Sequence, residues 1–334
     1  MVDETGFVKQ GKHSAGVARQ YCGTLGKIAN CQVGVFLGYA SPRGHTGVDG
    51  VLFVPAGWFQ DGQRCQKVGI PPEMVHRTKP QLALEMLELA LEAGVPARWV
   101  VGDEGYGSDG VLAVRSNEKP STWPPYGAPG QTAVAELGSA LPGEGWKRHS
   151  CGEGAQGPRL DDWACLPLRP ALQEGWVHAL LLRRHPNRIQ EVAYYLVYAP
   201  VAWPLAEMVR AAGSRWTIEE MFKLATGQVG LDHYEVRSWL GWHRHITLAL
   251  VALAALAVGW PKGGAFLPRA HPPHCPGNPT TLGPTPVGDR STGRAGHRLV
   301  PLAASAPEDG PVMPPPSPFE TTKGTVILEP IPNP

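Results

Sequence analysis

The chain has 334 residues, of which 43% are hydrophobic and 18% are charged, and its formal net charge is +1. This length allows one large domain or two modest ones around a buried core. The near-neutral charge excludes a chain-wide basic attraction to phosphate, so we expect a dedicated DNA-binding domain to be missing and any DNA contact to come from local basic patches.

The first sixty residues alternate short apolar segments with glycine-containing turns, as strands of a sheet do. We predict strands at residues 27–40 and 48–54, with the turn GHTG between them. The segment around Asp3 is expected to form the neighbouring strand. Because Met1 lies only two residues before Asp3, most of that strand is expected to be absent.

The clearest predicted helix spans residues 78–93. Thr78 and Gln81 form a capping box at its start, and Gly94 ends it. Leucines spaced i, i+3 and i+7 predict a face that packs on a sheet, and they are Leu84, Leu87 and Leu91. A short apolar strand at residues 98–102 then ends at Asp103. Strand, helix and strand in this order, with a carboxylate at the end, are typical of an α/β layer.

After Asp103 the chain contains a segment of unusual composition, two strands and two helices. Residues 117–180 are rich in Gly, Pro and Trp, and regular structure is difficult to assign there. Strands are expected at 177–183 and at 192–198. Two helices follow, one at 204–212 stopped by Gly213 and one from Ser214 with a core face. That face consists of Ile218, Phe222 and Ala225.

The last apolar segment, residues 246–260, is shorter than the roughly 20 residues of a membrane span. We therefore predict a buried core helix and no membrane partner. From residue 261 onward the composition changes, because 18 of the 35 prolines fall in 261–334. A disordered proline-rich tail is the expected structure there.

Three acidic residues stand in motif-like contexts: Asp3 in VDETGF, Asp103 in WVVGDEGYG and Glu219 in RWTIEEMF. Two aspartates at strand ends and one helical glutamate can converge on a pair of Mg²⁺ ions. Two such ions about 3.5–4 Å apart can clamp the attacking and leaving oxygens of a phosphodiester. Each residue also has a plainer interpretation, as a solvated or turn aspartate or as part of a surface ion-pair helix.

The segments that contain these residues resemble bacterial insertion-sequence transposases of the DDE type, in the branch with a strand-rich insertion before the Glu. The match includes the long block RQYCGTLGKIANCQV and extends from residue 2 to about residue 258, more weakly at 107–165. It implies an α/β fold, an RNase H-like mixed sheet with flanking helices, interrupted by a β-rich insertion. The implied parts are the first part of the core at 1–116, the insertion at 117–200, the C-terminal helices at 201–260, and the tail at 261–334.

The resemblance also implies a reaction. Asp3, Asp103 and Glu219 would be catalytic and would hold Mg²⁺, with Mn²⁺ as a substitute, for DNA cleavage and strand transfer in transposition. Arg215 would hold a DNA phosphate. The family's lysine seven residues after the Glu is Thr226 here, and Lys223, one turn earlier, is its expected substitute.

Further DNA contacts are expected on a basic, glycine-rich stretch and after the Glu-bearing helix, at Lys9, Lys12, Arg19, Arg237 and His243. A solvated face or a polar turn is the alternative for these residues. The implied partners are transposon ends and target DNA, with self-association on DNA. Six cysteines without CxxC spacing and an N-terminus without an apolar signal region favour the bacterial cytoplasm, near the nucleoid.

This chain departs from the family in its start, in the replaced lysine and in its tail. The run GDEGYGSDGVLAV also lacks an expected helix, which predicts an uncovered sheet face and low thermal stability. We therefore expect a truncated or degenerate copy. Two alternatives are a non-catalytic transposase remnant with weak or no DNA binding, and an unrelated α/β protein with a proline-rich tail and no metal dependence.

Overall fold

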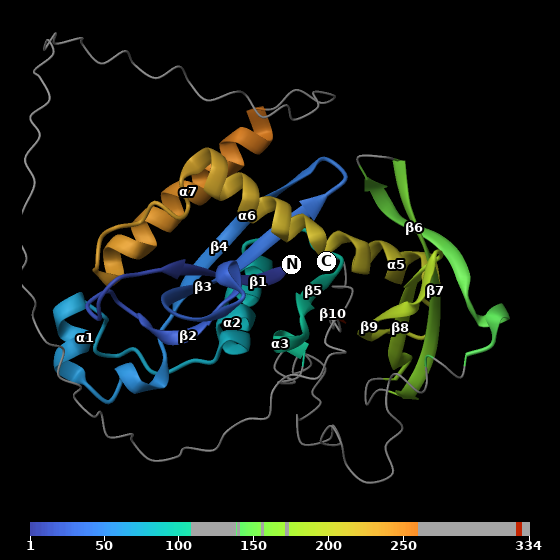
Figure 1. Ribbon diagram of the computed structural model, residues 1–334, viewed down its shortest axis with the longest axis horizontal. Coiled ribbons are helices and arrows are strands. Elements are labelled where there is room, and N and C mark those ends of the chain that lie inside the picture. The colour runs from blue at the N-terminus through green and yellow to red at the C-terminus, as the bar shows by residue number, and fades with distance from the viewer. Residues whose placement is uncertain (108–137, 139–140, 155–156, 171–173, 260–324, 329–334) are drawn as a thin grey trace, which may run out of the picture. The chain divides into compact units, whose positions relative to one another are not determined.

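The computed structural model describes residues 1–107, 138, 141–154, 157–170, 174–259 and 325–328 (Figure 1). One four-stranded sheet, sheet A, contains β1 (Val2–Val8), β2 (Ala18–Cys22), β3 (Lys27–Ser41) and β4 (Gly44–Phe53). A six-stranded sheet, sheet B, contains β5 (Val100–Asp103), β6 (Lys147–Gly154), β7 (Gly157–Pro170), β8 (Trp176–His185), β9 (Arg188–Pro200) and β10 (Thr325–Leu328). The helices are α1 (Gly62–Val68), α2 (Lys79–Glu92), α3 (Glu104–Gly107), α5 (Leu205–Ser214), α6 (Trp216–Val229) and α7 (Trp239–Gly259).

Sheet A is antiparallel, and its long strand β3 pairs with β1, β2 and β4. Strand β1 pairs with β3 along all seven of its residues, from Val2 opposite Leu37 to Val8 opposite Cys31. The expectation that the strand around Asp3 is mostly absent is therefore wrong. The paired residues begin at Val2, and most of them lie after Asp3.

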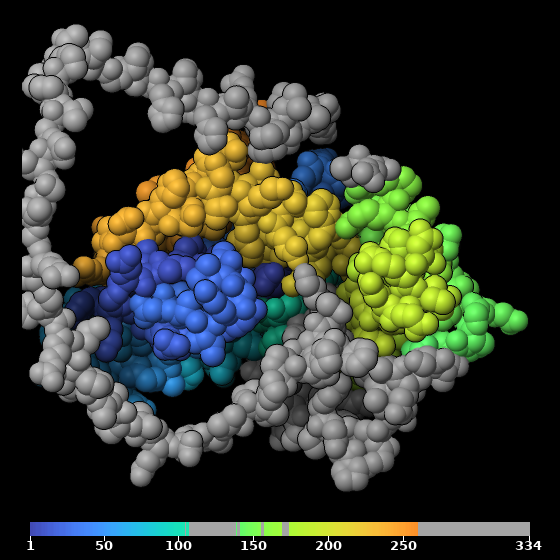
Figure 2. Space-filling view, in the orientation of Figure 1, coloured from blue at the N-terminus to red at the C-terminus, as the bar shows by residue number. Residues whose placement is uncertain are grey.

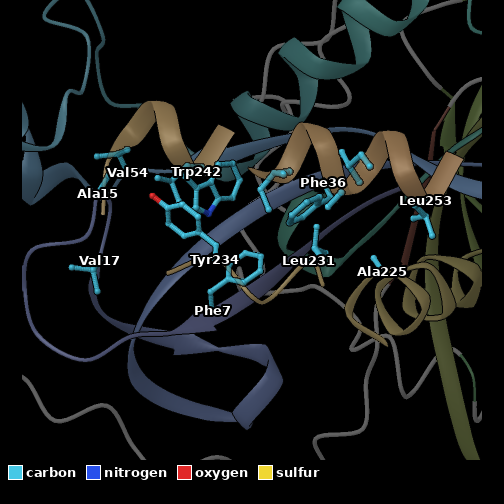
Figure 3. Packing of buried hydrophobic residues seen from close by; sticks show 14 of the residues in the cluster. Phe7, Ala15, Val17, Phe36, Val54, Ala225, Leu231, Tyr234, Trp242 and Leu253 are labelled. Atoms are coloured by element: carbon cyan, nitrogen blue, oxygen red, sulfur yellow. The ribbon is translucent and has the colours of Figure 1, made fainter. Parts of the chain in front are cut away.

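Helices cover both faces of sheet A. Alternate side chains of β3 point to opposite faces, so Val35 and Leu37 pack with α2, while Phe36 packs with α6 and α7. Figure 3 shows Phe36 and Trp242 in the second of these layers. In the space-filling view, the yellow and orange helices α6 and α7 lie directly against the blue strands (Figure 2). This layering makes the protein a mixed α/β protein, as predicted.

Glycine at one position of β3 lets α7 approach closely. A Cβ atom on Gly34 would lie 2.9 Å from Cζ2 of Trp242, closer than real Cβ atoms come to a neighbour. The indole is fully buried there against Phe7 and Phe36. A larger residue at position 34 would push α7 away from the sheet.

Helix α2 begins as predicted, with Thr78 at the N-cap and a complete capping box to Gln81. Its buried face differs from the predicted leucine row, because Leu84 and Leu91 are only partly buried. The fully packed residues are Leu82, Ala83, Met86, Leu87 and Ala90. The face is rotated because small and flexible residues also contribute to it, which a pattern of leucines alone does not register.

Sheet B continues from β6 to β9 as antiparallel neighbours, and β10 then pairs parallel with β9 and antiparallel with β5. Strands β6 and β7 lie in the segment where the residue pattern alone assigned no element and where the family resemblance implied a strand-rich insertion. Their glycines and prolines hid an alternation in β7, where Trp163 and Ala164 pack into different clusters on opposite faces. The RNase H-like strand order and the four predicted parts of the chain remain predictions.

The C-terminal elements require three corrections. The predicted tail contains β10, whose TVIL sequence suits a strand, so continuous disorder is wrong for these four residues. Helix α5 continues past Gly213 to Ser214. Helix α7 is buried on one face only, since Ile246 is 1% exposed and Leu248 is 69% exposed. By length and composition α7 could cross a membrane, a test that core helices also pass.

The helix that the sequence predicted to be missing after residue 107 lies outside the described residues.

Candidate active site

Two of the predicted aspartates come together from different sheets. Asp3 is the second residue of β1, and Asp103 is the last residue of β5. These strands lie side by side although they are not hydrogen-bonded to one another as a ladder (Figure 1). Backbone N–H groups orient both carboxylates. Glu4 N donates to Oδ1 of Asp3 at 2.8 Å, and Gly105 N donates to Oδ1 of Asp103 at 3.0 Å.

The Asp3 carboxyl is in an unusual electrostatic environment. Burial raises its pKa to about 7, the Arg215 guanidinium opposes this shift, and the Asp103 carboxylate adds to it. Its side chain is only 13% exposed. A cation between the two carboxylates would reverse the effect of both burial and like charge, because it favours the ionised form. Asp3 and Asp103 therefore fit a hard divalent cation, which is usually held by one or two carboxylates plus substrate oxygens.

Glu219 is linked to Asp3 by ion pairs that both carboxylates form with Arg215. The Arg215 guanidinium lies 3.5 Å from Oδ2 of Asp3 and donates to Oε1 of Glu219 at 2.9 Å. Glu219 itself is in the first turn of α6 and is 53% exposed. Arg215 thus joins two of the three predicted acids by charge. Among the described residues, no three His, Cys, Asp or Glu side chains are placed to share one metal ion.

Glu4, the neighbour of Asp3, is held in a different way. Its carboxylate accepts hydrogen bonds from Lys79 Nζ at the start of α2 and from the Tyr106 hydroxyl at 2.7 Å. Tyr106 is buried, and burial together with Glu4 raises the pKa of its phenol. Because Lys79 neutralises Glu4, this carboxylate serves the structure, and Asp3 is the better candidate ligand of the two.

The sequence patterns did not predict Lys79 and Tyr106 as parts of the site. Tyr106 stands in the GDEGYG motif, three residues after Asp103, so the motif itself carried a signal. Lys79 carried none, because a lysine in the first turn of a helix is ordinarily a solvated residue.

Residues 1–161 match the family described as DDE superfamily endonuclease. The similarity to DDE superfamily endonucleases therefore covers just under half of the chain. The matched residues include Asp3 and Asp103 and end before α6, so Glu219 and Arg215 lie outside the match. No curated protein matches the chain.

Two of the residues predicted to contact DNA, Lys9 and His243, make contacts within the protein. Lys9 donates to the Tyr234 carbonyl and lies over the Tyr234 ring, and burial lowers its pKa. The His243 Nδ1 lies 3.0 Å from the Trp239 carbonyl, and burial lowers the pKa of that imidazole. Both side chains therefore have partners within the protein, and their contact with DNA stays a prediction.

The other predicted cations are in more accessible places. Lys12, Arg19, Lys223 and Arg237 are exposed. Lys223 is on the same helix as Glu219 and lies 4.0 Å from Glu220. The Thr226 hydroxyl donates to the Phe222 carbonyl at 2.9 Å, so it bonds within its own helix and does not replace a cation.

Proposed function

We propose that this chain is the catalytic part of a DDE transposase of the bacterial insertion-sequence type, which cleaves DNA strands and transfers them with the help of Mg²⁺ or Mn²⁺. The observation that carries the proposal is the pair Asp3 and Asp103. Two strands from distant parts of the sequence bring these carboxylates together, and the family match includes both. DDE-type endonuclease chemistry acts on DNA, so transposon ends and target DNA are the proposed substrates.

Asp3 and Asp103 would hold the metal, and Glu219 would complete the ligand set. When bound, the ions would supply activation of water and of the freed 3′-hydroxyl, together with stabilisation of the attacking and leaving oxygens. Asp3 would lose its proton as a cation is bound, because its raised pKa leaves it partly protonated at neutral pH. Partial burial of Asp3 keeps much of the bulk water away from this carboxylate.

Arg215 has two proposed positions. In the structure it pairs with Asp3 and Glu219, which balances their charge. With a cation bound between the carboxylates, the guanidinium would be released from Asp3 and would be available for a DNA phosphate, where its planar donors favour two parallel hydrogen bonds. Glu219 is exposed enough to change rotamer without repacking the core.

The remaining DNA contacts are proposed for the exposed cations Lys12, Arg19, Lys223 and Arg237. Each neutralised phosphate releases counterions, so binding through these residues would weaken with salt. Self-association on DNA belongs to the same proposal.

The test is a nicking assay on supercoiled plasmid that carries the DNA flanking the gene, with Mg²⁺ or Mn²⁺. Asp3→Asn and Asp103→Asn should abolish nicking. The matched control is Asp49→Asn in β4, since Asp49 also accepts a hydrogen bond from the N–H of the next residue, at 2.7 Å. Equal loss of nicking in the control would contradict the assigned roles.

A non-catalytic remnant is the second candidate. Its support is the absence, among the described residues, of three acids placed around one ion, with Glu219 paired to Arg215 instead. It predicts no nicking by folded wild-type protein with either metal. Fluorescence anisotropy with labelled duplex DNA would then decide whether DNA binding persists.

A further inference from the structure

Sheet B makes close contact with the junction between α5 and α6. Gly213, the second-last residue of α5, faces Cys151 of β6 so closely that a methyl group on it would collide with the Cys151 carbonyl group. Backbone contacts of this kind are rigid, because neither side can yield as a flexible side chain would. Strand β6 and the end of α5 are therefore held in a fixed position relative to one another.

Strands β6 and β7 form an antiparallel hairpin, and one arginine of this hairpin bridges β6 and the end of α5. Nη2 of Arg159, on β7, donates to the Cys151 carbonyl at 3.3 Å and to the Gly213 carbonyl at 3.2 Å. The second bond gives a carbonyl in the last turn of α5 a cationic donor, and positive charge is favourable at that end of a helix. The guanidinium also lies 4.8 Å from the ring centre of Trp216, the first residue of α6.

The residue held between these two helices is Arg215. It is both the C-cap of α5 and the N-cap of α6, and its backbone bonds to both, with Arg215 N to Ala212 O at 3.3 Å and Ile218 N to Arg215 O at 3.1 Å. The direction of its side chain therefore depends on the angle between α5 and α6. That side chain pairs with Asp3 and Glu219.

We propose that Arg159 is a positioning residue, which sets the α5–α6 junction and thereby places Arg215 and Glu219 relative to Asp3. Strands β6 and β7 then have a role in the reaction, although none of their described residues contacts the Asp3 or Asp103 carboxylate in a described interaction. This inference rests on the proposed nuclease function for its effect on metal binding, but its structural part is independent of that function.

Arg159→Ala is the main variant and Arg148→Ala is its matched control. Arg148 is in the same hairpin and bonds across it to Asp162 at 2.9 Å, without contact to α5 or α6 in any described interaction. Hydrogen–deuterium exchange of the full chain should be faster over residues 213–220 in Arg159→Ala and unchanged there in Arg148→Ala. Unchanged exchange in Arg159→Ala, or an equal increase in the control, would overturn the positioning role.

Calorimetric titration with Mn²⁺ provides the second readout. Partners that orient metal ligands typically contribute about 10–100-fold in affinity, so Arg159→Ala should bind Mn²⁺ about tenfold or more weakly, with Arg159→Lys intermediate. If the wild type binds no Mn²⁺ while exchange still responds to Arg159→Ala, the proposed function fails and the positioning role stands.

If Arg159→Ala does not fold, Trp216→Leu replaces it. Trp216 is partly exposed, and its loss removes the ring under the guanidinium without altering the hairpin. It should also speed exchange over 217–220 and weaken Mn²⁺ binding. An unchanged Mn²⁺ affinity and unchanged exchange in this variant would contradict the proposal.

Discussion

The Tyr106 hydroxyl donates to Oε2 of Glu4 at 2.7 Å, and this bond joins the two segments that carry the candidate metal ligands. Glu4 follows Asp3 on β1, and Tyr106 follows Asp103 by three residues, in α3. Lys79 donates to the same carboxylate from the start of α2. The placement of the two aspartates thus depends on the hydrogen bonds of Glu4 with Lys79 and Tyr106, on the other side of β1 from Asp3.

Tyr106→Phe should destabilise the protein by about 1.5–3 kcal/mol, because it removes a buried hydrogen bond to a charged acceptor. Urea unfolding would measure this loss. Nicking should fall as well, since the Asp103 segment loses its bond to β1. Tyr21→Phe is the control, because Tyr21 is 59% exposed and its change should have little effect. A Tyr106→Phe variant as stable as the control would show that the bond contributes nothing.

The stability of the metal-free protein should depend on pH through Asp3. Its pKa is raised from 3.8 to about 7 on folding, so the folded state holds this proton more tightly than the unfolded state. The resulting stability is fully present below pH 3.8 and is lost as the pH rises to about 7. The free energy of unfolding of wild type, relative to Asp3→Asn, should fall by up to about 4 kcal/mol over this window.

Urea unfolding at a series of pH values in EDTA would check this, with Asp49→Asn as the control. The control should keep the pH dependence of the wild type. A wild type and an Asp3→Asn variant with parallel pH profiles would contradict a raised pKa at Asp3.

The two faces of α7 should respond differently to truncation. Ile246→Ala should cost about 2–5 kcal/mol, because Ile246 is buried against sheet A and its removal leaves a cavity. Leu248→Ala, on the exposed face, should change stability by less than about 0.5 kcal/mol. Thermal unfolding of the detergent-free protein measures both. Similar costs at both positions would show that the second face of α7 is also covered.

Lys223→Ala should weaken DNA binding evenly across sequences and reduce the salt dependence of binding. Removing one phosphate contact lowers the slope of log K against log salt by about 0.9. Fluorescence anisotropy at several salt concentrations gives the slope. Lys67→Ala on α1 is the control, since Lys67 is an exposed lysine outside the predicted set. An unchanged slope in Lys223→Ala would remove this residue from the proposed interface.

Local patterns in the sequence were sufficient for several elements. The capping box predicted the start of α2 at Thr78, and short apolar segments predicted β3 and the centres of β8 and β9. The resemblance carried by VDETGF and GDEGYG indicated the endonuclease family that residues 1–161 match. Caps, turns and strand alternation are interactions between residues near in sequence, so they are visible without a fold.

The tertiary structure alone decided which side chains meet. It placed Arg215 between Asp3 and Glu219, gave Glu4 to Lys79 and Tyr106, and turned Lys9 inward to Tyr234. It also inserted β10 between β5 and β9. These contacts join residues far apart in the chain, and their formation depends on shape and burial after the layers have packed, which no local period or spacing in the sequence encodes.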